Sequence, residues 1–184
     1  MKRVLVFLAD GFEECEALLV VDILRRAGAE VTTASVMEHR CVVSTHGVKL
    51  YADVMPADVD TASYDAVVLP GGIPGTPNLA AAPVVAETCA AFAGEGKLVA
   101  AICAAPSILG SLGILKGKKA TVYPGMEQTL IGAQPTAGEV VVDGNVITSR
   151  SMGTAIPFAL TIAARLYGEQ AAQKLASDIC YDHF

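Results

Sequence analysis

The sequence is poor in charged and aromatic residues. Charged residues make up 17% of the 184 positions and aromatic residues 5%, and there is no tryptophan. Because 53% of the chain is hydrophobic, it can bury enough apolar surface to offset the entropy of ordering, which excludes a disordered protein. Thirteen Lys and Arg against 19 Asp and Glu give a net charge of −6, with no basic tail. We therefore expect no nucleic acid or anionic membrane surface as a partner.

Paired cysteines are also lacking. The five cysteines are scattered and contain no CxxC pair, which predicts free thiols and a reducing, cytoplasmic location. The N-terminal apolar run is too short for a signal peptide, and acidic residues follow it at once. The uncharged segment 98–115 approaches the ~18 residues of a membrane span, but Pro106, Gly110 and Gly113 interrupt it. We read that segment as a strand, a turn and a helix.

Strand and helix signals alternate along the chain. Short β-branched apolar runs predict buried strands, and apolar residues spaced three and four apart predict helices. The expected strands are 3–9, 30–36, 66–69 and 98–102, the helices are 13–27, 83–92, 105–112, 154–167 and 170–177, and hairpins are expected at 41–54 and 140–149. This pattern predicts one α/β domain over residues 1–184, with a mainly parallel sheet and helices on both faces.

Three segments that could carry chemistry each follow a predicted strand. They are Asp10–Glu16, Pro70–Gly75 and Cys103. Open parallel sheets bind ligands beyond the carboxyl ends of their strands. We therefore expect the three segments to converge on one crevice.

Cys103 is the candidate nucleophile. It follows an apolar strand directly and precedes a helix, with the small residues Ala101 and Ala105 on either side, as a nucleophile elbow requires. The helix start behind it should favour the thiolate. The alternative is a buried cysteine that packs as a small hydrophobic residue, which is the interpretation we give to the other four cysteines.

Glu16 is the candidate proton carrier. On a helix it shares a face with Leu19 and Ile23, so its carboxyl should be partly desolvated and its pKa raised. A carboxyl in that state can donate or accept a proton near neutral pH. The alternative is that Glu16, like Glu13, only favours the helix start, where Asp10 and Glu13 resemble a capping box.

Gly71 and Gly72 are candidate oxyanion-binding residues, because paired glycines let the backbone approach a ligand and offer free amides. A tight turn alone would also explain them. The loop has neither the Walker motif nor the dinucleotide-binding glycine spacing, so we expect no phosphate site.

Histidine is scarce. His39, His46 and His183 all lie far from Cys103 in the sequence, so no Cys–His dyad is visible locally, although a distant or partner-chain histidine remains open. No spacing of ligand residues indicates a metal site.

The motifs resemble those of the DJ-1 branch of the ThiJ/PfpI superfamily. The resemblance is carried by segments 10–16 (DGFEECE), 67–72 (VVLPGG), 100–106 (AAICAAP), 146–150 (VITSR) and 153–155 (GTA), and it runs nearly from end to end. It implies a flavodoxin-like three-layer α/β/α sandwich, commonly a homodimer, with no cofactor and no metal.

The resemblance also implies roles for individual residues. Cys103 would be the reactive, oxidation-sensitive cysteine, and protonated Glu16 would hydrogen-bond its sulfur. The amides of Gly72 and Ala104 would form the oxyanion pocket. Tyr123 stands where this branch often has a histidine, and a phenol is a poor general base at neutral pH. Ala104 stands where the PfpI branch has a histidine, which counts against a peptidase.

The expected function is a glyoxalase or deglycase type of reaction on small reactive carbonyls such as methylglyoxal, or on their protein adducts. The alternative is a redox sensor or chaperone that acts through oxidation of Cys103. A PfpI-type cysteine peptidase is the third interpretation, and it would need a histidine within hydrogen-bond reach of Cys103.

Overall fold

The computed structural model describes residues 1–184. Its strands are β1 (Arg3–Leu8), β2 (Glu30–Ser35), β3 (Cys41–Val43), β4 (Lys49–Tyr51), β5 (Ala66–Leu69), β6 (Leu98–Ile102), β7 (Lys119–Ala120), β8 (Gln134–Pro135), β9 (Val140–Asp143) and β10 (Val146–Ser149). Its helices are α1 (Glu14–Arg26), α2 (Gly75–Ala81), α3 (Pro83–Glu95), α4 (Pro106–Ser111), α5 (Ala155–Tyr167) and α6 (Glu169–Asp178).

Six of the strands form the central sheet, in the order β2-β1-β5-β6-β10-β9. The first five of these are parallel to one another, and β9 adds an antiparallel edge through its hairpin with β10. Numbered along the chain, the parallel strands stand in the order 2-1-3-4-5, which is the flavodoxin-like order. The predicted fold class is confirmed.

Alternation along the buried strands divides the core into two layers. Val4, Val6 and Leu8 of β1 belong to the core beneath α1 and α5, whereas Leu5 and Phe7 belong to the core beneath α3. Successive side chains of a strand point to opposite faces of a sheet. The continuous apolar run of β1 is therefore what a strand covered on both faces requires.

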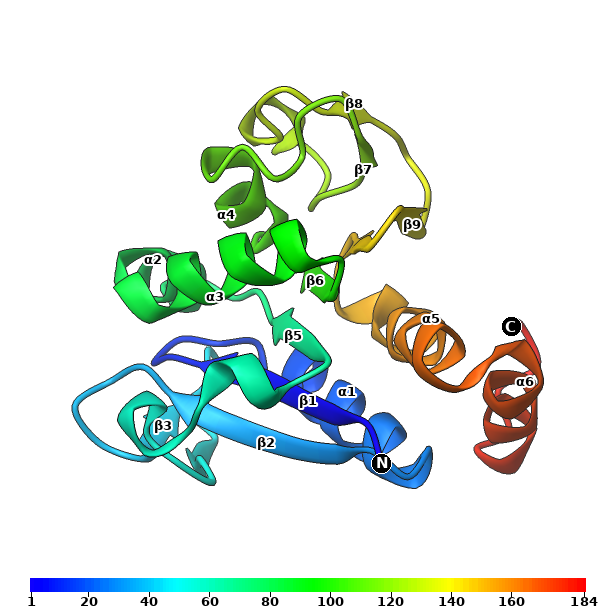
Figure 1. Cartoon of the computed structure of the whole chain (residues 1–184), viewed down its shortest axis with the longest axis horizontal. Coiled ribbons are helices and arrows are strands. Elements are labelled where there is room, and N and C mark those ends of the chain that lie inside the picture. Colours follow the sequence, from blue (N-terminus) through cyan, green and yellow to red (C-terminus); the bar gives the residue numbers. More distant parts are fainter.

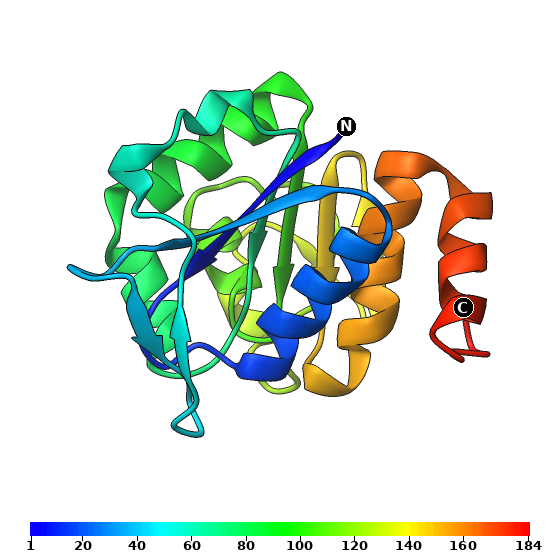
Figure 2. The same ribbon diagram turned by 90° about the horizontal axis from the view of Figure 1, so that it is seen from below.

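The helices lie on both faces of the sheet. Figure 2 shows α1 in blue and α5 in orange side by side on one face, with the green α3 on the other. The last helix, α6, packs on α5 and forms an outer layer at that side (Figures 1 and 2). Helices α1 and α5 begin at the end of the molecule to which β6 points, so helix starts gather at the carboxyl ends of the strands.

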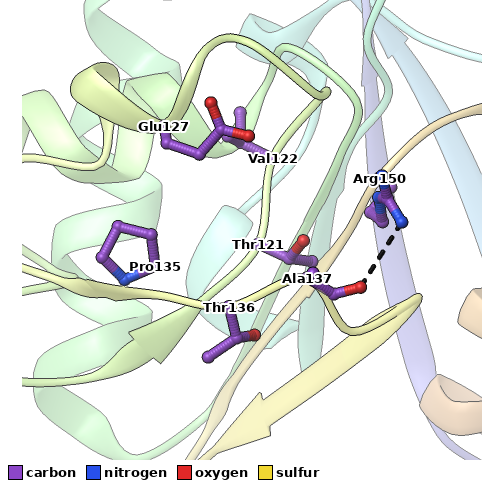
Figure 3. Close-up of a pocket in the computed structure, with 7 residues that line it drawn as sticks. All are labelled: Thr121, Val122, Glu127, Pro135, Thr136, Ala137 and Arg150. Atoms are coloured by element: carbon purple, nitrogen blue, oxygen red, sulfur yellow. Dashed lines mark hydrogen bonds between the residues drawn. The ribbon is translucent and has the colours of Figure 1, made fainter.

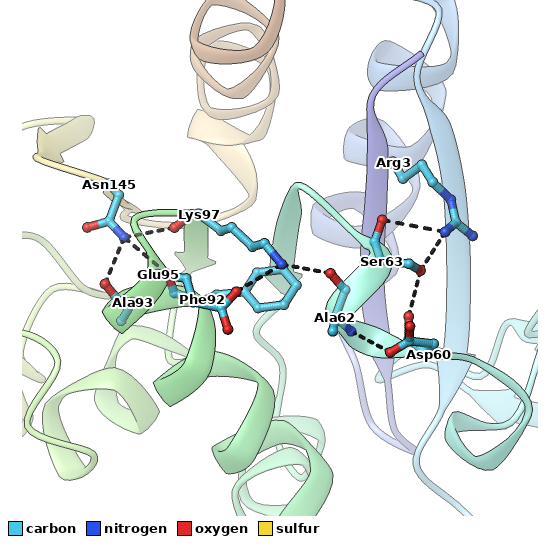
Figure 4. Close-up of polar contacts among 9 residues, drawn as sticks. All are labelled: Arg3, Asp60, Ala62, Ser63, Phe92, Ala93, Glu95, Lys97 and Asn145. Carbon is cyan, nitrogen blue, oxygen red and sulfur yellow. Dashed lines mark hydrogen bonds and ion pairs between the residues drawn. The ribbon is translucent and has the colours of Figure 1, made fainter.

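Polar contacts fix the opposite end of the sheet, where the parallel strands begin (Figure 4). The Asn145 side chain donates to the carbonyls of Ala93, at 3.2 Å, and Lys97, at 2.8 Å, which joins the β9–β10 turn to the end of α3. The Lys97 ammonium lies 4.9 Å from the centre of the Phe92 ring and donates to the Ala62 carbonyl. These contacts set where β6 and β10 start.

The structure differs from the sequence-based expectation in two places. The expected glycine-rich loop is shorter than predicted, because α2 begins at Gly75. A two-stranded sheet of β7 and β8, which was not predicted, lies beside β9 (Figure 1). Both features are short and lack a strong periodic signal. None of the helices combines the length and the apolar character needed to cross a bilayer.

Candidate active site

Cys103 occupies a sharp bend between β6 and α4. Its φ is 63°, a left-handed conformation that costs a residue with a side chain about 1–3 kcal/mol. Two backbone hydrogen bonds hold it there: its amide donates to Ser149 at the end of β10 (3.0 Å), and its carbonyl accepts from Tyr123 (2.8 Å). The thiol is half-buried. The strained bend matches the elbow geometry expected from the sequence.

Glu16 reaches the same point from the first turn of α1. The side chain of Glu13 caps this helix by accepting from the Glu16 amide at 2.7 Å. The sequence suggested that Asp10 takes part in the cap, but its carboxylate accepts instead from the Val43 amide in the hairpin. Glu16 itself is 1% exposed, because it heads the apolar face of the helix.

Gly71 lies between Glu16 and Cys103. Its amide donates to Glu16 Oε2 at 2.9 Å. A Cβ added at Gly71 would lie 2.6 Å from both Glu16 Oε2 and the Cys103 Cβ, so only glycine allows the two side chains to meet here. The Gly71 amide is therefore occupied, and the oxyanion role expected of it passes to Gly72 and Ala104.

Burial acts on the pKa of both members of the Glu16–Cys103 pair. Burial raises the pKa of Glu16 to about 7 against its ordinary 4.5, although the hydrogen bond with Cys103 and the amides of Gly71 and Met152 oppose the rise. Burial and the charge of Glu16 raise the pKa of Cys103 to about 12, and the amides of Ala104 and Gly72 counter this only in part. Two acids in one desolvated site compete to stay neutral. Burial therefore opposes ionisation at both groups, and Glu16 is the titratable side chain beside the thiol.

Two backbone amides face the sulfur. The amides of Gly72 and Ala104 have no backbone carbonyl as a partner, and as donors toward the sulfur both lower the pKa of Cys103, so they favour negative charge at that position. Gly72 has a φ of 95°, which turns its amide in a direction that other residues rarely reach. Free amides that converge on one atom are the arrangement that an oxyanion-binding site requires.

A cavity of about 580 Å³ opens over these groups. It receives residues from the ends of β1, β5, β6 and β10 and from the β3–β4 turn, so the convergence expected from the sequence is present. The residues that line it are Glu13, Glu16, Thr45, His46, Gly72, Ile73, Cys103, Ala104, Tyr123, Pro124, Gly125, Met126, Ser151 and Met152. No lysine or arginine is among them. Sequence reasoning missed the apolar wall of Ile73, Met126 and Met152, because nothing in their local pattern distinguishes them from ordinary loop residues.

His46 is the histidine of this cavity. Its Nδ1 lies 2.9 Å from Glu14 Oε1, and no histidine forms a hydrogen bond with Cys103. Glu13, Glu14 and His46 could offer metal-ligating atoms within 4.8 Å of one another. The helix cap already engages Glu13, and His46 and Glu14 engage each other, so we assign no metal to this group.

The other cysteines are not uniformly packing residues. Cys89 is buried, Cys41 is half-buried, and Cys15 and Cys180 are exposed. The interpretation from sequence is therefore wrong for Cys15, on the solvent side of α1, and for Cys180, in the turn that follows α6. None of these four thiols lines the cavity above Cys103.

A second hollow, of about 200 Å³, lies beside the β7–β8 lobe (Figure 3). Arg150 spans its edge and donates to the Ala137 carbonyl at 3.4 Å, with Glu127 and Thr136 among the other lining residues. It contains no cysteine and no buried acid. The chemistry of the molecule is therefore concentrated in the larger cavity.

The order of the strands and the cysteine elbow together define a class: flavodoxin-like α/β proteins that carry their site on a strand-to-helix cysteine. Within that class the chain belongs to the DJ-1/PfpI family, whose model matches residues 2–165. The resemblance seen in the motifs is thereby confirmed.

Individual relatives are similar over most of the chain. The protein DJ-1 homolog A of Arabidopsis thaliana is 40% identical over 179 residues, which are 96% of this chain and 46% of the relative, so the chain spans less than half of that protein. A protein of Pyrococcus abyssi that is named a deglycase is 38% identical over 154 residues, 82% of this chain and 91% of the relative. The solved structure of oxidized Toxoplasma gondii DJ-1 superposes with a TM-score of 0.96 at 36% identity and covers 100% of both chains.

Proposed function

We propose that the protein is a cysteine-dependent, cofactor-free enzyme of the glyoxalase or deglycase type. The observation that carries the proposal is the strained Cys103 elbow, packed through Gly71 against a buried Glu16 whose pKa is about 7. The similarity to a protein named a deglycase supports this reaction class. The substrate would be a small reactive carbonyl such as methylglyoxal, or its adduct with a protein group.

The proposed reaction begins with proton transfer from the Cys103 thiol to Glu16 as the sulfur attacks the aldehyde carbon. The amides of Gly72 and Ala104 stabilise the oxyanion of the resulting hemithioacetal. Glu16 passes the thiol proton to the hemithioacetal oxygen and, ionised again, removes the proton from the carbon that bears the sulfur. It returns this proton to the neighbouring carbon while the hydroxyl proton shifts to the neighbouring oxygen, which converts the hemithioacetal to a lactoyl thioester. A carboxyl with a pKa near neutrality can act in both directions. Hydrolysis of the thioester releases lactate and the free thiol.

The test is lactate formation from methylglyoxal by the wild type and by Cys103→Ala. We expect formation by the wild type and its loss in the variant, with Cys89→Ala as the matched control, since that thiol is buried in the core away from the cavity. Equal rates in the wild type and Cys103→Ala, or no lactate from either, would contradict the proposal.

A redox sensor or chaperone is the second candidate, because the same free amides of Gly72 and Ala104 could hold the oxygens of an oxidized sulfur. Mild peroxide followed by peptide mass spectrometry tests this function. Oxygen added at Cys103 ahead of the exposed Cys15 and Cys180 would support it, and oxygen added only at the exposed thiols would exclude it.

We also propose a homodimer in the cytoplasm. Apolar side chains stay exposed on the β3–β4 hairpin, where Val48 is 46% and Tyr51 73% exposed, and all five cysteines are free. Sedimentation of the wild type and of Tyr51→Asp tests the assembly. A wild type that sediments as a monomer would rule it out.

A further inference from the structure

Hydrolysis of the thioester in the proposed reaction requires a base for the attacking water, and the obvious groups do not supply it. Glu16 is 1% exposed and is engaged by the Gly71 amide, so it serves the sulfur and the two substrate carbons. Tyr123 lines the cavity, but a phenol is a poor base at neutral pH. The inference below rests on the proposed function and concerns its last step.

The β3–β4 turn brings one imidazole to the cavity. The turn is held against the loop that precedes α1: the Thr45 amide donates to the Phe12 carbonyl at 2.8 Å and its hydroxyl to the Gly11 carbonyl at 2.7 Å. His46 follows directly and lines the cavity that contains Cys103. Its side chain is 69% exposed in the isolated chain.

Glu14 holds the His46 ring in one orientation. Its side chain is 16% exposed and its Oε1 lies 2.9 Å from Nδ1 of the ring. Burial would raise the pKa of Glu14, but hydrogen bonds with its own amide, the Ser44 hydroxyl and His46 overcome this and keep the pKa below its usual value. A carboxylate that stays ionised favours the tautomer with the proton on Nδ1, which leaves the lone pair of Nε2 free to accept a proton.

We propose that His46, positioned by Glu14, is the general base for hydrolysis of the Cys103 thioester. Water attacks the carbonyl carbon, its proton passes to His46 Nε2, and a new C–O bond forms as the C–S bond breaks. The proton then returns to the sulfur, so the products are the hydroxy acid and the free thiol. The proposed roles are those of a nucleophile, a base and an orienting acid, and the attacking water would enter the cavity that Cys103 and His46 both line. Glu14 is a positioning residue, because it acts through the ring.

The experiment compares the wild type with His46→Gln under saturating methylglyoxal, with EDTA in every buffer because His46 belongs to the metal-capable group. His39→Gln is the matched control, since His39 is exposed and lies outside the cavity. We expect lactate formation to fall roughly 100-fold in His46→Gln, the lower end of what a general base contributes, and to stay unchanged in His39→Gln. Free imidazole should restore part of the rate.

A second measurement separates a chemical role from a structural one. Denatured samples taken during turnover are treated with hydroxylamine. This reagent converts a thioester to a hydroxamate, whereas a hemithioacetal gives no hydroxamate. We expect the lactoyl thioester on Cys103 to accumulate in His46→Gln and, less strongly, in Glu14→Gln. Wild-type rates and no thioester in His46→Gln would overturn the inference while leaving the proposed function intact. If the wild type forms no lactate at all, the proposed function fails, and the role of His46 fails with it.

Discussion

Replacing Glu16 by glutamine should change how stability depends on pH. Glutamine keeps the volume and the acceptor for the Gly71 amide but cannot ionise. Below pH 4.5 the carboxyl is protonated in both the native and the unfolded state, so it contributes no difference. Between pH 4.5 and 7 it ionises in the unfolded chain and stays protonated in the native state, so the free energy of unfolding falls as the pH rises. Above pH 7 the loss is complete.

The size of the effect follows from the pKa of Glu16, which burial raises from 4.5 to about 7. Each pH unit between these values costs the native state about 1.4 kcal/mol, about 3 kcal/mol in all. Glu16→Gln should therefore gain about 3 kcal/mol relative to the wild type between pH 4 and pH 8. The carboxyls of lowered pKa, such as Asp65, change stability in the opposite sense but are present in both proteins and cancel in the difference.

Urea unfolding at fixed protein concentration, repeated at each pH unit from 4 to 8, measures this difference. Glu87→Gln is the control, because Glu87 is exposed on α3, and its difference from the wild type should not vary with pH. If the difference between Glu16→Gln and the wild type is the same at pH 4 and pH 8, the carboxyl titrates as a solvated group. Burial of Glu16 would then not be what sets its pKa.

Two further changes test the geometry. Gly71→Ala places a methyl group 2.6 Å from both the Cys103 Cβ and Glu16 Oε2, so we expect the free energy of unfolding in urea to fall by about 1–3 kcal/mol and most lactate formation to be lost. Gly94→Ala is the control, because the space around its Cβ is open, and it should change neither quantity. A Gly71→Ala variant that stays active would refute the contact. Asn145→Ala leaves the carbonyls of Ala93 and Lys97 without their shared donor (Figure 4). We expect the free energy of unfolding to fall by about 1–2 kcal/mol. An unchanged urea midpoint would show that water replaces the amide.

Local patterns were sufficient to predict much of the site. An apolar strand that ends at a cysteine between small residues predicts an elbow, and a glutamate at the head of an apolar helix face predicts a buried carboxyl. Both features depend on residues within one or two turns of each other. The resemblance in the motifs then implied that the Glu16 carboxyl lies against the Cys103 sulfur, a contact that neither local pattern shows alone.

Contacts between distant segments were not predictable in this way. Gly71 donates to Glu16, 55 positions away, and His46 meets Glu14 across 32 positions. Both depend on how the β1, β5 and hairpin segments are placed side by side.

The sequence by itself determined the fold class, the order of the longer strands and helices, and the cysteine and acid that face the crevice, because periodicity and small-residue spacing are local properties of the chain. Tertiary structure alone decided that the Gly71 amide is taken up by Glu16, which histidine enters the cavity, and how far burial raises the pKa of Glu16. The reason is physical: a pKa and a hydrogen bond depend on distance and desolvation in space, and these are set only when separate strand ends come together at one edge of the sheet.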